Sequence, residues 1–270
     1  MTDPLLVAEG LRKSFRPPQR LLGRAGEEFP AVRGVSFALA PGETLALVGE
    51  SGAGKSTTGR LVLRLIEPDA GRVSFDGTDV LALPADELRT MRRRMQMIFQ
   101  DPFSSLDPRV PIGESVAEPL LVHFGLKHGE RLDRAAALLE RCGMGRHHLG
   151  RYPADLSGGQ LQRAAIARAL TLQPQLIVAD EPVAALDVSV RAQVLNLMKD
   201  LQEEFGMSYL FITHDLALVE VIADRVAVMR SGEIIEEGSV ERIFAAPEHD
   251  YTKELVAAIP VPDPRRRLTA

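Results

Sequence analysis

The first fifty residues concentrate apolar side chains in short runs that predict β-strands. The runs are LLVAEGL at 5–11, AVRGVSFALA at 31–40 and TLALVG at 44–49. The second run alternates, whereas the third is continuously apolar, which is typical of a strand covered on both faces. The stretch 16–30 is rich in Pro, Gly and charge, so it predicts a surface loop.

A Gly-rich loop follows the third run, and the pattern then changes to helical spacing. Residues 56–66 predict a helix, and 71–77 predict a short strand and turn. From about 85 to 175 the apolar spacing is predominantly helical. Helices are expected at 85–95, 114–125, 131–143 and 157–170.

The second half of the chain alternates strand and helix patterns. Apolar strands are expected within 175–182 and 207–215, and a hairpin at 226–238. Helices are expected at 189–206 and 215–226. Such alternation predicts an α/β fold with a mostly parallel sheet and crossover helices. The helical block at about 100–165 interrupts this sheet as an inserted lobe.

Composition limits the classes of function that remain. Of the 270 residues, 45% are hydrophobic and 26% charged, which is ordinary for a globular protein with one large or two modest domains. The net charge of -5 gives no support to a nucleic-acid partner. Cys142 is the only cysteine, which excludes an intrachain disulfide. No run approaches the roughly 20 apolar residues that cross a bilayer, so a membrane role is expected to be peripheral.

The segment Gly49–Ser56 fits the pattern G-x-x-x-x-G-K-[ST] between an apolar strand and a helix. Glycines let backbone N–H groups approach phosphate, and the helix N-terminus favours negative charge. Lys55 supplies a charge for the outer phosphates, and the Ser56 hydroxyl is placed to bind Mg²⁺. The alternative is a structural Gly-rich turn. The residues expected to bind the nucleotide are Gly49, Glu50, Ser51, Gly52, Ala53, Gly54, Lys55, Ser56 and Thr57.

Two adjacent carboxylates, Asp180 and Glu181, follow the apolar run that begins at Leu176. Neighbouring residues at a strand end point in different directions, so the two carboxylates can divide their tasks. Phosphoryl transfer needs one acid to hold the metal and another group to orient or deprotonate the attacking water. We therefore assign Asp180 to Mg²⁺ and Glu181 to the water. Turn chemistry is the alternative for an Asp-Glu-Pro sequence.

A third motif, LSGGQ at 156–160, resembles the signature motif of the ATPase subunits of ABC transporters. The other motifs of that family occur in order: Gln100 in IFQDP, ALD at 185–187 and His214 in FITHD. The resemblance covers about residues 5–260. It implies ATP hydrolysis, with ATP and Mg²⁺ as the bound species.

The resemblance also implies a fold. It is a P-loop NTPase (RecA-like) core with a mostly parallel sheet, an antiparallel β subdomain and an inserted α-helical subdomain. A single ATPase domain is expected over 5–260. Its core and β subdomain would span about 5–95 and 166–240, the helical subdomain about 100–165, and a C-terminal extension 241–270.

The signature segment has a physical interpretation of its own. Ser157 opens a helix and precedes two glycines, so hydroxyl, free N–H groups and a positive helix end form a second anion site. A helix cap without a ligand is the alternative. The resemblance implies that this segment closes over ATP held by another subunit, with Asp187 at the interface. The residues expected to make cross-subunit contacts are Leu156, Ser157, Gly158, Gly159, Gln160 and Asp187.

Three further roles come from the resemblance alone. Gln100 would touch Mg²⁺ or the attacking water and report the nucleotide state to the inserted lobe. His214 would contact the γ-phosphate and fix the geometry of Glu181, although an isolated histidine there could also cap a helix. Phe15 in LRKSF is the best match for the aromatic residue that stacks on adenine, with Phe29 as a rival and a core phenylalanine as the alternative.

Several strings resemble the oligopeptide/dipeptide importer branch, which includes nickel and glutathione importers. They are QDPFSSLDPR at 100–109, RYPADLSGGQLQR at 151–163, DEPVAALDVSVRAQVLNLM at 180–198 and PEHDYTKELVAAIP at 247–260. Ala53 and Ala184 depart from residues frequent in that branch, but neither removes a charge or a metal ligand.

This branch implies an ATP-hydrolysing subunit that energises import of a peptide or related small solute. Its expected partners are a second ATPase subunit (the same chain or a homologue), two membrane-spanning permease subunits and an extracytoplasmic substrate-binding protein. The expected location is peripheral, on the cytoplasmic face of the cell membrane. The alternatives are another ABC branch, such as an exporter, or a soluble ABC ATPase acting on nucleic acid or ribosomes. The single ATPase module and the negative charge argue against the latter.

Overall fold

A computed structural model describes residues 3–16 and 28–259. Its centre is a six-stranded sheet in the order β10-β9-β3-β8-β7-β6. Neighbours from β9 to β6 run parallel, and β10 is antiparallel to β9. This arrangement confirms the prediction of a mostly parallel sheet. The strands are β3 (Thr44–Val48), β6 (Met95–Ile98), β7 (Leu176–Asp180), β8 (Ser208–Thr213), β9 (Arg225–Arg230) and β10 (Glu233–Ser239).

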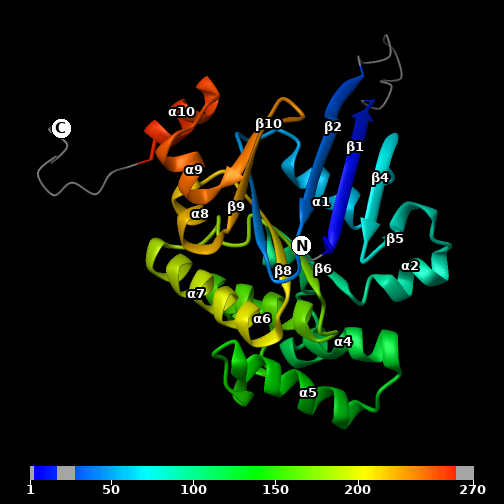
Figure 1. Cartoon of the computed structure of the whole chain (residues 1–270). Helices are drawn as coiled ribbons and strands as arrows, with labels where there is room; N and C mark the ends of the chain where they lie inside the picture. Colours follow the sequence, from blue (N-terminus) through cyan, green and yellow to red (C-terminus); the bar gives the residue numbers. More distant parts are fainter. Residues whose placement is uncertain (1–2, 17–27, 260–270) are drawn as a thin grey trace, which may run out of the picture.

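A second, antiparallel sheet lies beside the first (Figure 1). Its order is β2-β1-β4-β5. Helix α1 (Lys55–Val62) joins the two sheets through one hydrophobic cluster that contains Leu6, Leu47 and Leu61. Burial of these side chains fixes the base of the loop before α1. The strands are β1 (Leu6–Phe15), β2 (Phe29–Leu39), β4 (Ala70–Phe75) and β5 (Thr78–Asp79).

The helices between β6 and β7 lie together at the bottom of Figure 1, and the helix that follows β7 lies beside them, to the left. A second hydrophobic cluster joins Val116 and Leu161 of these helices to Ile98 and Ile177 of the sheet. The cluster thereby holds the helical region against the β6 edge. The helices are α3 (Pro102–Ser105), α4 (Ile112–Phe124), α5 (His128–Arg141), α6 (Gly158–Leu170) and α7 (Val188–Phe205), with short 3-10 turns at Arg146–His148 and Pro153–Asp155.

The C-terminal elements cover the β9 side of the sheet. A third cluster packs Val219, Ile243 and Tyr251 against Val48 and Val228. None of the helices in the described ranges is long and apolar enough to span a membrane. The remaining elements are α2 (Ala85–Met91), α8 (Leu216–Ile222), α9 (Val240–Ala245), α10 (Asp250–Ala257) and a 3-10 turn at Val80–Ala82.

Two local predictions were wrong. The helix expected at 56–66 ends at Val62, and Arg64 adopts a positive φ of 48° that stops it. The helix expected at 85–95 ends at Met91, and residues 95–98 form β6, which pairs with β7. A four-residue apolar run carries too little periodicity to separate strand from helix.

Two other expectations, a surface loop at 16–30 and the subdomain boundaries, are not settled by the described residues. Most of the loop expected at 16–30 falls outside the described residues, and β2 already begins at Phe29. The subdomain boundaries remain predictions.

Candidate nucleotide site

The loop Gly49–Ser56 connects β3 to α1 and lies tightly against two other strands. A Cβ on Gly49, where φ is 152°, would stand 2.1 Å from the carbonyl oxygen of Met229 in β9. A Cβ on Gly54, where φ is 100°, would stand 2.2 Å from the carbonyl oxygen of Ala31 in β2. Only glycine fits these two positions. Close contacts with neighbouring backbone therefore explain why the sequence pattern has glycine at these two positions.

Helix α1 begins without a side-chain cap, because its N-cap is Gly54 in a left-handed conformation. The N–H groups of its first turn are thus available to an anion. Lys55, only 5% exposed, donates from Nζ to the carbonyl oxygens of Gly49 at 2.7 Å and Glu50 at 2.8 Å. Burial lowers the pKa of Lys55, against the opposing effect of nearby carboxylates, Glu181 foremost. A buried ammonium beside an uncapped helix end is an anion site.

Ser56 and Asp180 meet at the far end of the loop. The Ser56 hydroxyl donates to Asp180 Oδ1 at 2.7 Å. Asp180 is 1% exposed, and burial raises the pKa of its carboxyl. A hydroxyl and a carboxylate oxygen are hard ligands of the kind that Mg²⁺ prefers. The pair therefore fits the metal that the sequence predicts, and a bound cation would offset the cost of burying the charge.

Glu181 follows β7 in a strained conformation. Its φ is 47°, and its N–H donates to the carbonyl oxygen of Ile212 in β8 at 2.9 Å. Its Oε2 lies 2.8 Å from Nδ1 of His214, which follows β8. Non-glycine residues at positive φ persist where surrounding contacts impose them, often at functional sites. The structure thus brings together two residues that are 33 positions apart.

Gln100 lies at the same edge of the sheet. It follows β6, which pairs in parallel with β7, and it is exposed. Because β6, β7 and β8 are adjacent parallel strands, the residues that follow them share the carboxyl edge of the sheet.

The signature segment Leu156–Gln160 lies in the helical region and caps its own helix. The Gln160 N–H donates to Ser157 Oγ at 3.3 Å, and the Ser157 N–H donates to Gln160 Oε1 at 2.9 Å. Ser157 and Gly158 are exposed. In the described part of the chain no hydrogen bond joins this segment to residues 49–56. The structure does not bring the two motifs together within one chain.

The start of α7 lies against the signature segment. A Cβ on Gly159 would stand 2.5 Å from Val190 Cγ1, so α6 and α7 approach closely at that glycine. Asp187 is the N-cap of α7 and is exposed. Ser157 and Asp187 thus belong to one exposed surface at the N-termini of two packed helices.

The two candidate aromatic residues are partners across adjacent strands. Phe15 ends β1 and pairs with Phe29 at the start of β2; they are 40% and 57% exposed. Phe29, together with Glu50 and Ala53, lines a cavity of about 330 Å³ beside the phosphate loop, whereas Phe15 is not among its lining residues. The role of Phe15 stays a prediction.

One contact to the phosphate loop was missed from the sequence. The hydroxyl of Tyr251 in α10 accepts a hydrogen bond from the Glu50 N–H at 3.1 Å. The sequence signal was the string PEHDYT at 247–252, which resembles the importer branch but does not by itself indicate a contact with the phosphate loop.

The strand–loop–helix unit and the carboxylates at the sheet edge define a P-loop nucleotide-binding fold. The family model described as "ABC transporter" matches residues 32–184, more than half of the chain. The chain belongs to this family, which confirms the resemblance seen in its motifs.

Known proteins agree with this assignment. The chain is 51% identical over 265 residues to the glutathione import ATP-binding protein GsiA of Pectobacterium atrosepticum, covering 98% of this chain and 42% of that protein. The chain thus spans about two-fifths of the length of the curated relatives that it matches. Among solved structures, the ATP-binding cassette MJ0796, a dimer bound to ADP and Pi, has a TM-score of 0.76 at 31% identity, covering 87% of this chain and 98% of that one. The structure of cbiO1 from Clostridium perfringens, part of the transporter complex cbiONQ, has a TM-score of 0.77 at 28% identity, covering 90% and 92%.

Proposed function

We propose that the chain is an ATP-hydrolysing subunit that energises import of a peptide or related small solute through membrane-spanning partners. The observation that carries the proposal is one sheet edge that holds a phosphate loop, the Ser56–Asp180 pair and the Glu181–His214 pair. This edge groups residues suited to bind the triphosphate, to hold the metal and to orient the attacking water.

The loop and its lysine bind the triphosphate. Lys55 exchanges its two carbonyl partners for phosphate oxygens, which carry a full negative charge and attract it more strongly. The residues proposed to line the phosphates are Gly49, Glu50, Ser51, Gly52, Ala53, Gly54, Lys55, Ser56 and Thr57, with Phe15 proposed to stack on adenine.

Ser56, Asp180 and Gln100 are proposed to hold Mg²⁺, which neutralises charge on the phosphates when bound. Glu181 accepts a proton from the attacking water as its oxygen bonds to the γ-phosphorus and the bond to ADP breaks. His214 holds the Glu181 carboxylate through the 2.8 Å contact and is proposed to contact the γ-phosphate as well. Both residues act only on the step that breaks the bond.

The second half of the site comes from another cassette. The exposed Ser157–Gly158 end of α6 offers hydrogen-bond donors and a helix end to a triphosphate held elsewhere, and the exposed Asp187 is proposed to lie beside it at the interface. A structural neighbour is described as a dimer of cassettes with ADP and Pi. We propose the same arrangement here, with either a second copy of this chain or a homologue as the partner.

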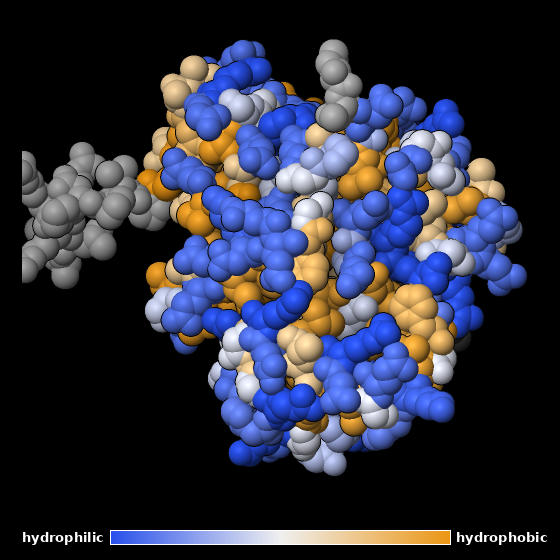
Figure 2. Space-filling view, turned by 60° about the horizontal axis from the view of Figure 1, so that its bottom comes forward, coloured by the Kyte–Doolittle hydropathy of each residue, from blue (hydrophilic) through white to orange (hydrophobic). Residues whose placement is uncertain are grey.

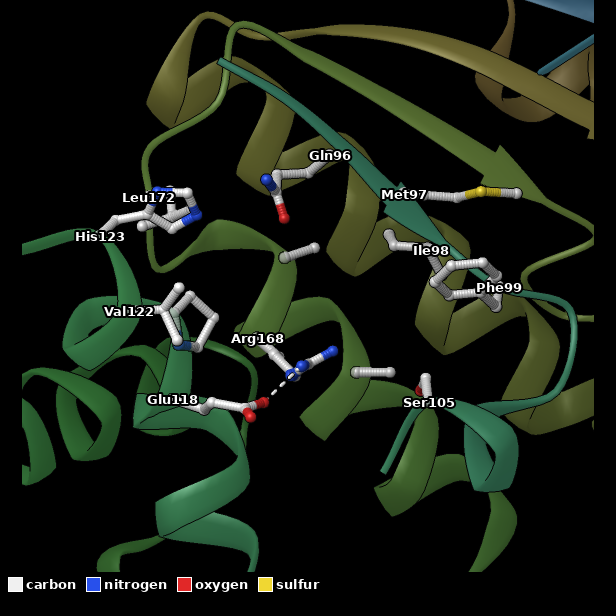
Figure 3. A pocket seen from close by; sticks show the side chains of 13 residues that line it. Gln96, Met97, Ile98, Phe99, Ser105, Glu118, Val122, His123, Arg168 and Leu172 are labelled. Carbon is white, nitrogen blue, oxygen red and sulfur yellow. Dashed lines mark hydrogen bonds and ion pairs between the residues drawn. The ribbon is translucent and has the colours of Figure 1, made fainter. Parts of the chain in front are cut away.

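A groove next to Gln100 is the proposed docking site for a membrane-spanning partner. It has a volume of about 290 Å³ and lies between the end of β6, helix α4 and helix α6. Figure 3 shows Phe99 on one side, Val122 and His123 on the other, and the Arg168–Glu118 ion pair of 2.7 Å between them. The groove joins β6, which leads into Gln100, to the helical region, so a partner seated there contacts both.

Exposed apolar residues occur at this groove and on the helices beside it. Val122 lines the groove, and Phe103 in α3 and Leu121 and Phe124 at the end of α4 are also exposed. Apolar patches also interrupt the hydrophilic surface in Figure 2. Exposed apolar residues around a groove are typical of an interface with another protein.

The transport branch rests on relatives and on sequence strings. The relatives carry glutathione import in their names, and the string at 247–260 resembles the peptide-importer branch. Membrane permeases, an extracytoplasmic substrate-binding protein and a peripheral location on the cytoplasmic face of the membrane complete the proposal. Membership of another transporter branch is the competing function, and the identity of the co-purified permease decides between them.

Glu181→Gln tests the assignment of hydrolysis. The variant is expected to bind Mg·ATP as the wild type does and to lose roughly 100-fold or more in turnover, because the general base is gone. Binding is measured by calorimetry and turnover by phosphate release. Glu203→Gln, on the exposed face of α7, is the matched control and keeps wild-type turnover. Wild-type turnover in Glu181→Gln would remove Glu181 from its role.

A cysteine placed in the groove tests the partner. Cys142 is fully buried, and burial raises the pKa of its thiol to about 12, so it does not compete for a thiol cross-linker. Val122→Cys is expected to cross-link to a membrane-spanning subunit in native membranes, whereas Lys199→Cys on α7 is not. Equal cross-linking from both positions would contradict the docking site.

A further inference from the structure

The C-terminal segment 247–252 is fixed to the sheet by one buried carboxylate. Glu236 in β10 is 7% exposed and accepts the N–H groups of Glu248 at 2.8 Å and His249 at 3.0 Å. His249 Nδ1 then accepts the Tyr251 N–H at 3.1 Å and caps α10. These bonds set both the position and the direction of the first turn of α10.

Tyr251 stands on that turn and points at the phosphate loop. It is 3% exposed, and the guanidinium of Arg230 lies 4.6 Å from the centre of its ring. Its hydroxyl accepts the N–H of Glu50, which is 201 residues away in the sequence. A residue of the C-terminal segment thus bonds directly to the second residue of the phosphate loop.

The bond holds a residue that organises the rest of the loop. The Glu50 carbonyl oxygen accepts from Lys55 Nζ at 2.8 Å and from the Ala53 N–H at 3.2 Å. The Ala53 carbonyl oxygen in turn accepts the Gly232 N–H, at the β9–β10 turn, at 3.0 Å. The loop is therefore held at Glu50 by α10 and at Ala53 by the hairpin.

We propose that Tyr251 is a positioning residue, which holds the first half of the phosphate loop in the shape that accepts a nucleotide. The inference rests on the proposed nucleotide binding. Without the hydroxyl, the Glu50 N–H loses its partner and the loop samples other shapes, so part of the binding energy is used to restore it. Once the nucleotide is bound, its phosphates hold the loop, so the rate at saturation is unchanged.

Tyr251→Phe removes only the hydroxyl and keeps the ring over which Arg230 stacks. The KM for ATP and the dissociation constant for Mg·ADP are each expected to rise about three- to tenfold, the effect of one ordinary hydrogen bond, with kcat unchanged. Tyr209→Phe is the matched control. Its hydroxyl is also buried and bonds to backbone, donating to the Met198 carbonyl oxygen at 3.1 Å, but it lies outside the loop. This control should lower thermal stability without changing nucleotide affinity.

Amide hydrogen exchange supplies a second readout that does not depend on nucleotide. The Glu50 amide is expected to exchange faster in Tyr251→Phe than in wild type or in Tyr209→Phe. Wild-type affinity and wild-type exchange in Tyr251→Phe would overturn the inference, as would an equal loss of affinity in both tyrosine variants. Failure of the wild type itself to bind ATP would instead refute the proposed function.

Discussion

Two helix N-termini in this chain are proposed to bind phosphate, and they are built in opposite ways. The N-cap of α1 is Gly54, which offers no side chain to the helix and lies beside the buried ammonium of Lys55. The N-cap of α6 is Ser157, which caps the helix together with Gln160 and is exposed. The first terminus leaves its donors to a ligand, whereas the second has already satisfied part of its own.

The phosphate loop and the signature segment also differ in how many other elements hold them. The phosphate loop is held by β2, β9, the β9–β10 turn and α10, so its shape exists before a nucleotide arrives. The signature segment contacts chiefly its own helix and the start of α7. We infer that one chain can load a nucleotide by itself, and that the signature segment acts only when another cassette presents one.

Lys55→Ala should give the largest effect, because Lys55 is the only buried lysine or arginine among the described residues. We expect affinity for Mg·ATP to fall roughly 100-fold or more, in line with the loss of a preorganised electrostatic contact. Calorimetric titration measures it, with the exposed Lys253→Ala as control. An unchanged affinity would mean that the N-terminus of α1 does not depend on the Lys55 ammonium to bind a nucleotide, and so would contradict the contrast with α6.

Ser157→Arg should separate binding from hydrolysis. A bulky side chain at the exposed N-terminus of α6 is expected to leave nucleotide affinity within about twofold of wild type. Turnover should fall roughly tenfold or more, because the arginine obstructs closure over the partner's nucleotide. Ser239→Arg is the matched control, since Ser239 is another exposed serine N-cap and accepts the Arg242 N–H at 3.3 Å. Loss of nucleotide affinity in Ser157→Arg would contradict the division of tasks.

A smaller effect is expected when acid protonates Glu236, which holds the C-terminal segment that contacts the phosphate loop. Burial opposes the charge of Glu236, but the hydrogen bonds that it accepts from the 248–252 segment and the positive charge of Arg242 together outweigh burial, so its pKa lies below the usual 4.5. The folded state therefore binds fewer protons than the unfolded state. The contribution of Glu236 to stability is present above about pH 4.5 and is lost as pH falls through its lowered pKa.

Glu236→Gln checks this pH dependence. The difference in unfolding temperature between wild type and this variant, followed from pH 6 to about pH 3, should be largest at the upper end and shrink on acidification. A difference that does not change with pH would show that the carboxylate charge does not stabilise the C-terminal segment.

Much of the fold and the chemistry could be predicted from the sequence, for physical reasons. The buried strands are unbroken apolar runs, and Gly49 and Gly54 of the phosphate loop are dictated by contacts with Met229 and Ala31. Short apolar segments such as β6 were misassigned because four residues do not reveal a period. Tyr251 was missed because a tyrosine on an amphipathic helix resembles an ordinary core residue until the fold places it beside Glu50.

The most direct test of the account is complementation between two impaired variants, with the wild-type chain hydrolysing ATP as the reference. Lys55→Ala keeps an intact signature segment, and Ser157→Arg keeps an intact phosphate loop. If the loop of one chain works with the signature segment of another, mixing the two restores up to about a quarter of the wild-type rate, because half of the randomly formed two-fold dimers contain one intact site of two. A mixture no more active than the separate variants, beside an active wild type, would contradict the account.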